Sequence, residues 1–167
     1  MSKLFSKKNI FYISIIIFIF LLDRFTKIYI LNYVENNGNI NIYVNQFLNL
    51  ILVWNTGIGF GLLSSDGTIF YHLITVIIIF VNIIIIYLII KSEDSRIYFL
   101  LLILGGSLGN LFDRIYYFAV PDFIDINYNG FHWFIFNVAD IFISIGIICL
   151  ITSELFFFNK TKNEKKL

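Results

Sequence analysis

The sequence predicts an all-α integral membrane protein with four transmembrane helices and a small β-platform in the first outer loop. Its 167 residues are 59% hydrophobic and 14% charged, whereas an ordinary soluble domain carries about 25% charged residues. The mean hydropathy is +0.85, and four apolar segments approach or reach the ~20 residues that a spanning helix needs. We expect residues 1–167 to form a single membrane-embedded domain.

The four helices are expected at about residues 10–33, 69–90, 97–114 and 138–158. The second and fourth are almost wholly apolar. The first contains Asp23, Arg24 and Lys27, and the third is short, so both must keep polar side chains against protein or near an interface. The first segment also imitates a signal peptide, but charged residues stand where a cleavage site has small ones, which indicates an uncleaved anchor.

The distribution of Lys and Arg predicts that both termini are cytoplasmic. Three lysines precede the first helix, two basic residues lie in the 91–96 connector, and four lysines occupy the C-terminal tail. The connectors 34–68 and 115–137 contain no Lys or Arg. Because positive charge stays on the cytoplasmic side, these two connectors face outward. Within 34–68, alternating and β-prone residues followed by a Gly-rich turn predict short strands on the membrane surface.

Composition disfavours several classes of function. The single cysteine cannot form an intrachain disulfide, and two histidines without a Cys cluster make a zinc or haem site improbable. A net charge of +1 gives no support to nucleic-acid binding. We therefore expect no metal, no haem or other cofactor and no nucleic acid. Membrane lipids are the expected partners of this membrane protein, and it is expected to be a monomer.

Helix rise places unusual polar residues at one level. With ~1.5 Å per residue, polar side chains of the first and third helices lie about 20 to 26 Å above the inner face. The fourth helix begins at that outer level, and the connector before it lies just above. The polar residues concerned are Asp23, Lys27, Asn110, Asp113, Arg114, Asp122, Asn137 and Asp140.

Simpler interpretations exist for most of these residues and their neighbours. Asp23 and Lys27 have the spacing of a helical i,i+4 ion pair, and the charged pair at 113–114 has the composition of an ordinary interfacial site. Gly105 and Gly109 fit a close helix-packing face. Asp125 is interpreted as a surface carboxylate. His132 is interpreted as a neighbour of the aromatic belt. Asn82 is interpreted as a hydrogen-bonded core residue.

Asp122 and Asp140 resist such interpretations, because neither has a Lys or Arg within four residues. A carboxylate at membrane depth is costly unless it is paired, protonated or hydrated, and it marks a functional site by default. Two facing carboxylates share one proton near neutral pH. One then accepts a proton from attacking water while the other hydrogen-bonds the substrate oxygen, as in aspartic proteases.

Five strings occur in the order typical of bacterial lipoprotein signal peptidases, also called signal peptidase II. They are LDRFTK (22–27), NTGIGFG (55–61), GGSLGNLFDR (105–114), VPDFID (120–125) and FNVAD (136–140). The chain resembles this family across all four predicted helices. Trp54 and Pro121 depart from the residues usual in the family at those positions.

The resemblance implies a bacterial inner-membrane aspartic endopeptidase with its site near the periplasmic face. It would remove the signal peptide from diacylglyceryl-modified prolipoproteins by cleaving before the lipidated cysteine. Asp122 and Asp140 match the family's catalytic pair. Five matched positions line or support the substrate pocket, namely Asn55, Gly57, Asn110, Arg114 and Asn137, and three are structural or supporting, namely Asp23, Lys27 and Asp113. The residues alone leave two other classes open, a proton-linked transporter and a structural assembly subunit.

Overall fold

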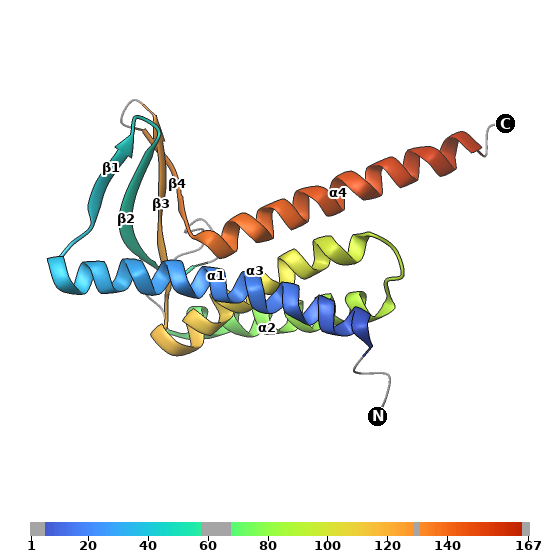
Figure 1. Cartoon of the computed structure of the whole chain (residues 1–167), viewed down its shortest axis with the longest axis horizontal. Helices are drawn as coiled ribbons and strands as arrows, with labels where there is room; N and C mark the ends of the chain where they lie inside the picture. The colour runs from blue at the N-terminus through green and yellow to red at the C-terminus, as the bar shows by residue number, and fades with distance from the viewer. Residues whose placement is uncertain (1–5, 58–67, 129–130, 165–167) are drawn as a thin grey trace.

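The structure is a computed structural model that describes residues 6–57, 68–128 and 131–164, with the side chains of 157–164 left out of the description. Long helices run along one direction, and a sheet stands across one end of them (Figure 1). The elements in chain order are α1 (Lys7–Asn37), β1 (Asn41–Asn45), β2 (Leu48–Asn55), α2 (Thr68–Lys91), α3 (Arg96–Tyr117), β3 (Val120–Tyr128), β4 (Phe131–Phe136) and α4 (Val138–Glu164).

Helix α3 is the centre of the bundle, because it packs against α1, α2 and α4. Its glycines permit the close approach that the sequence predicted. A Cβ on Gly105 would lie 2.9 Å from Ile19 Cβ of α1, and one on Gly109 would lie 2.6 Å from Asp23 Oδ2. A Cβ on Gly106 would lie 2.5 Å from the Ala139 carbonyl oxygen of α4. The packing interpretation of these small residues is therefore confirmed.

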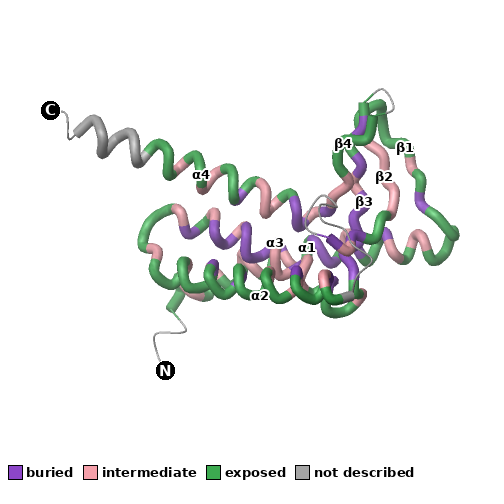
Figure 2. The backbone as a smooth tube through the Cα atoms, turned by 180° about the vertical axis from the view of Figure 1, so that it is seen from behind, coloured by how far each residue is buried: buried purple, intermediate pink, exposed green. Residues whose placement is uncertain are grey.

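Among the described residues, three helices are long and apolar enough to cross a membrane, at Ile69–Lys91, Arg96–Tyr117 and Val138–Phe156. The outer side of α2 is almost entirely exposed (Figure 2), and it carries large aliphatic and aromatic side chains. Such a surface is unsuited to water and suited to lipid. Helix α1 is not among the three, and it buries Asp23, Arg24 and Lys27 against the bundle.

The sheet is antiparallel in the order β1-β2-β3-β4, and half of it was not expected. The predicted platform lay in the first outer loop alone, whereas β3 and β4 come from the 115–137 connector. Strand β3 pairs with β2 along nearly its whole length, so that Asp122 lies opposite Val53 and Pro121 opposite Trp54. The prediction missed β3 because Pro121 and two aspartates are typical of loops. Pro121 is tolerated because it lies near the start of the strand, before the pairing of β3 with β4 begins at Ile124, so that β3 has only one neighbouring strand there.

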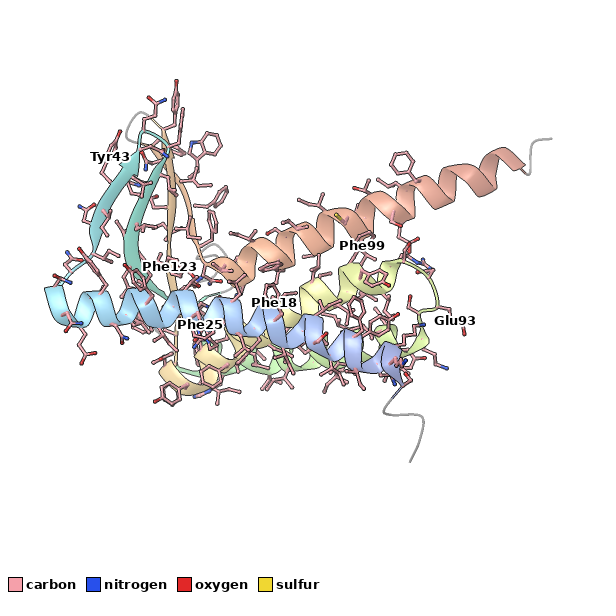
Figure 3. The ribbon with its side chains drawn as sticks, in the orientation of Figure 1. Phe18, Phe25, Tyr43, Glu93, Phe99 and Phe123 are labelled. Atoms are coloured by element: carbon pink, nitrogen blue, oxygen red, sulfur yellow. The ribbon has the colours of Figure 1, made fainter. Side chains whose placement is uncertain are left out.

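An apolar cluster fixes the sheet to the helices. Ile30 of α1, Ile40 and Phe123 of β3 are all buried there. Phe123 lies at the base of the sheet beside α1 (Figure 3). Because side chains alternate along a strand, burying Phe123 on this face directs Asp122 to the other face.

Candidate active site

The N-terminus of α4 is closed by a reciprocal capping arrangement. Asn137 precedes the helix, and its Oδ1 accepts a hydrogen bond of 3.1 Å from the backbone N–H of Asp140. In return, Asp140 Oδ2 accepts from the backbone N–H of Asn137 at 3.2 Å. This is a capping box, and it fixes the rotamer of Asp140 in the first turn. The positive end of the helix dipole also favours a carboxylate at this position.

Asp122 is held by two side-chain amides. Its Oδ1 accepts a 2.6 Å hydrogen bond from Asn137 Nδ2, and its Oδ2 accepts a 2.9 Å bond from Asn55 Nδ2. Asn55 is itself oriented, because its Oδ1 accepts from the backbone N–H of Gly57 at 2.8 Å. Asn137 therefore binds the Asp122 carboxylate with its side chain and the Asp140 carboxylate with its backbone. The two aspartates that are 18 residues apart in sequence share this one residue.

Burial raises the pKa of Asp122 to about 7, and the charge of Asp140 acts in the same direction. The amide donors of Asn55 and Asn137 partly oppose this rise, because they stabilise the charged carboxylate. Only 2% of Asp122 is exposed. The carboxyl group of Asp122 is therefore poised to gain or lose a proton near neutral pH.

A buried ionic cluster ties α1 to α3. Lys27 Nζ lies 2.8 Å from Asp23 Oδ2 and 2.6 Å from Asp113 Oδ2, and all three side chains are fully buried. The i,i+4 interpretation of Asp23 and Lys27 is thus correct but incomplete, since Lys27 also bridges two helices. Arg24 Nη2 adds a 2.5 Å contact to Asp113 Oδ1. The sequence prediction did not assign Arg24 to the site, although its place beside Asp23 in an apolar segment was a signal.

Two side chains connect this ionic cluster to the aspartate pair. Asn110 Oδ1 accepts from Lys27 Nζ at 2.8 Å, while Asn110 Nδ2 donates to Asp140 Oδ1 at 2.8 Å. Because Lys27 must face the carbonyl oxygen, it sets which end of the Asn110 amide points to Asp140. Asp23 Oδ1 accepts from the backbone N–H of Ala139 at 3.0 Å. Asp23 therefore caps the same helix end that presents Asp140.

Arg114 is buried, so its interpretation as an ordinary interfacial charge is wrong. Its Nη2 donates to the Gly57 carbonyl oxygen, which holds the segment after β2 against α3. Tyr71 of α2 donates to the Arg114 carbonyl oxygen at 2.6 Å. Within the described part of the chain, Arg114 Nε and Nη1 have no hydrogen-bond partner. Gly57 is the last described residue before the gap at 58–67, so the Gly-rich turn predicted there lies outside the described residues.

A groove of about 460 Å³ runs beside Asp140 between α2, α3 and α4. Asn110, Arg114 and Asp140 line its polar end. The remainder is almost wholly aliphatic, with Ile77 of α2 and Ile147 of α4 among its lining residues. One groove thus offers a long apolar surface that ends at a buried carboxylate.

Three residues outside the pair differ from their predictions. Asp125 is fully buried rather than a surface carboxylate, and its Oδ2 lies 2.7 Å from Nδ1 of His132 on the neighbouring strand. His132 thus has a polar contact beyond the expected aromatic-belt role. Asn82 is buried in α2, but its amide atoms have no hydrogen-bond partner among the described residues. In the same described ranges, no group of three or more His, Cys, Asp or Glu side chains is placed to hold a metal ion.

Comparison with known proteins assigns the family. A model of the family described as signal peptidase (SPase) II matches residues 15–156. The chain belongs to the signal peptidase II family. It is 52% identical over 165 residues to the lipoprotein signal peptidase of Pelagibacter ubique (strain HTCC1062), covering 99% of both chains. It is 39% identical over 153 residues to that of Anaplasma phagocytophilum (strain HZ), covering 89% of this chain and 94% of the relative.

Solved structures agree with this assignment. A bacterial membrane enzyme determined by the in meso method at 2.3 Å resolution superposes with a TM-score of 0.71. Its sequence is 32% identical, and the match covers 93% of this chain and 92% of that chain. A second such structure, at 1.9 Å resolution, gives a TM-score of 0.68 and covers 86% of this chain and 92% of that chain. As a signal peptidase II family member with apolar spanning helices, the chain is a membrane protease.

Proposed function

We propose that this protease is an aspartic endopeptidase that removes the signal peptide from diacylglyceryl-modified prolipoproteins. Cleavage takes place before the lipid-bearing cysteine, and Asp122 and Asp140 activate the water. The observation that carries the proposal is the position of Asn137, whose side chain binds one carboxylate and whose backbone binds the other. Asn137 thereby links two buried carboxylates, and the charge of Asp140 helps to raise the pKa of Asp122. Carboxylates that interact in this way titrate as a coupled pair.

The proposed chemistry uses one proton on the pair. The charged carboxylate takes a proton from water as the water oxygen attacks the peptide carbonyl carbon. The protonated carboxyl group donates a hydrogen bond to the carbonyl oxygen, which gains negative charge as the tetrahedral intermediate forms. When the intermediate collapses, the C–N bond breaks and the leaving amine takes a proton from the pair. The raised pKa of Asp122 supports the presence of this proton near neutral pH.

The groove beside Asp140 supports a substrate that arrives laterally from the lipid. Its aliphatic length suits a signal peptide or acyl chains, and its polar end suits the scissile bond. Arg114 lines the groove and has N–H groups without a partner among the described residues, which supports a role in binding a substrate carbonyl. Asn55, Gly57 and Asn110 are proposed to line or support the same pocket. Asp23, Lys27 and Asp113 act as its structural support.

The proposed topology has four spans in a bacterial inner membrane, with α1 as the fourth. Both termini are cytoplasmic, and the aspartate pair lies near the periplasmic face. The absence of Lys and Arg from 34–68 and 115–137 supports this orientation. The enzyme is proposed to act as a monomer, with the lipidated prolipoprotein and membrane lipids as its partners.

Purified enzyme in lipid-doped detergent tests the proposal directly. We expect it to cleave a diacylglyceryl-modified prolipoprotein on the N-terminal side of the modified cysteine, as read by mass spectrometry of both products. The matched control is the same prolipoprotein without the lipid, which we expect to be cleaved far more slowly. Equal cleavage of the two substrates, or cleavage at another bond, would contradict the proposal.

The pH profile should report the proton on Asp122. Its folded-state pKa of about 7 lies above the ordinary value of 3.8. As pH rises through this value the proton is lost, so the pair no longer has a donor for the carbonyl oxygen. We expect kcat/KM to fall on the alkaline side with a midpoint near 7, measured with the lipidated substrate in a constant-ionic-strength buffer series. A rate that keeps rising well above that midpoint would oppose this role.

Asn137→Ser separates capping from the contact with Asp122. Serine retains an oxygen that accepts from the Asp140 N–H, but it has no amide to donate to Asp122. Because that donor lowers the pKa of Asp122, its loss should move the alkaline midpoint upward and reduce activity. Asn137→Ala should additionally lose the cap and about 1 kcal/mol of stability. Thermal unfolding and pH profiles of both variants check this, and a downward shift in Asn137→Ser would contradict it.

A further inference from the structure

A second groove, which we term the α1–α2 groove, lies between these two helices at the end of the bundle opposite the sheet (Figure 1). Its volume is about 660 Å³. Helix α3 forms its floor, because α1 and α2 both pack on α3 but, in the described part of the chain, make at most slight contact with each other. Among the described residues, none lines both this groove and the groove beside Asp140. The α1–α2 groove is therefore a separate site.

The sides and floor of the α1–α2 groove are almost wholly aliphatic. Ile13 and Ile17 of α1 face Ile89 of α2 across it. On α3 the lining runs from Ile97 to Leu108, which is about 16 Å at ~1.5 Å per residue. One leaflet of the hydrocarbon core of a bilayer is about 15 Å thick, half of the ~30 Å total. The groove thus has the length and the apolar surface that suit a lipid acyl chain in one leaflet.

Polar side chains gather at one mouth of the groove, where α1 begins and α2 ends. Three of them line it there, namely Lys8, Asn9 and Ser92. The Lys8 ammonium lies 5.6 Å from the centre of the Tyr12 ring, which lines the groove one turn further in. No Asp or Glu is among the described lining residues, and Asp94 of the connector between α2 and α3 is bound to Arg96. The mouth therefore presents a positive charge without a lining carboxylate to neutralise it.

The charge at the mouth identifies the class of occupant. A signal peptide fits poorly, because its n-region is positively charged and would meet Lys8. A phospholipid with a net negative headgroup fits both ends, since its acyl chain matches the apolar length and its phosphate matches the ammonium. We propose that the α1–α2 groove binds one such anionic phospholipid, with the phosphate beside Lys8. The proposed topology puts this site in the cytoplasmic leaflet, but the site itself rests on the groove alone.

Native mass spectrometry of the full-length enzyme in detergent tests this site. The enzyme is freed of co-purified lipid and given an equimolar mixture of phosphatidylglycerol and phosphatidylcholine with identical acyl chains. We expect a one-to-one complex in which phosphatidylglycerol is favoured about fivefold, the effect of one lysine near a lipid surface. Lys8→Gln should abolish this preference. Lys7→Gln is the matched control, because Lys7 carries the same charge but does not line the groove, and it should retain the preference.

Ile17→Trp and Phe18→Trp test the part of the site that would hold the acyl chain. Ile17 lines the groove and Phe18 does not, and both are half exposed or more, so neither substitution puts an indole into the protein core. Ile17→Trp should lower the retention of both phospholipids, because the indole would occupy the space of the acyl chain. Phe18→Trp should leave retention unchanged.

Three results would overturn the proposal: equal retention of the two phospholipids by the parent, an equal loss of preference in Lys7→Gln and Lys8→Gln, or an equal response to the two Trp substitutions. A dimer without bound lipid would also overturn it, since a second copy would then occupy the groove. No substrate is added, so the result is independent of the proposed catalytic function.

Discussion

Asp122→Asn and Asp140→Asn are each expected to lower the rate of prolipoprotein cleavage by about 10²- to 10⁴-fold, the range of a general acid or base. An asparagine amide is nearly isosteric with the carboxyl group, but it can neither accept a proton from water nor carry the shared one. Initial rates with the lipidated substrate, at saturating and subsaturating concentrations, measure the loss. It should fall mainly on kcat, because the groove that binds the apolar part of the substrate is unchanged.

Asp125→Asn is the control for this experiment. Asp125 is as buried as Asp122 and lies on the same strand, but the alternation of the strand directs it to the opposite face. Its contact is with His132 rather than with Asn137. If Asp122→Asn lowered the rate only by disturbing β3, Asp125→Asn should lower the rate as strongly. If all three variants cleave at similar rates, the catalytic assignment is wrong.

The common level of the polar residues followed from the sequence, because helix rise is nearly constant. Asp23, Asn110 and Asp140 were predicted at one level, and the structure connects them through Asn110 and the first turn of α4. The same sequence contained a further signal, since Asn137 followed three residues later by Asp140 has capping-box spacing. That pattern alone predicts that Asp140 is fixed by its own helix end. The contact from Asn137 to Asp122 is tertiary, and no local pattern encodes it.

The strands of the 115–137 connector could not be predicted from the local sequence. Strand β3 contains a proline and two aspartates, and its extended form depends on pairing with β2, which is distant in sequence. β-propensity is a weak guide where a strand gains its stability from neighbours. Asp125 was misplaced for the same reason, because its burial depends on β4 and on His132. Long apolar helices are thus predictable from composition, whereas the half of the sheet that carries Asp122 is not.

Lys27→Met is expected to lower the free energy of unfolding by about 3 to 5 kcal/mol, the effect of removing one partner from a buried ion pair. Methionine fills much of the same volume but leaves Asp23 and Asp113 without the cation that both contact. The Asn110 amide also loses the partner that orients it toward Asp140. Denaturant unfolding in detergent–lipid micelles measures the loss. Arg96→Met is the control, because the half-exposed Arg96 pairs with Asp94 and Glu154 and should contribute about 1 kcal/mol or less.

Adding Asp113→Asn to Lys27→Met distinguishes electrostatics from packing. If the loss arises from uncompensated negative charge, neutralising Asp113 should restore part of the stability, although Asp113→Asn alone should be destabilising. Arg24, which also contacts Asp113, lies 3.6 Å from Asp23 and should still offset the charge of Asp23 in the double variant. Additive losses in the double variant would instead show that Lys27 stabilises the helix contact through packing of its aliphatic chain. The double variant should recover part of its stability without recovering activity. It still lacks the hydrogen bond from Lys27 that orients Asn110 toward Asp140.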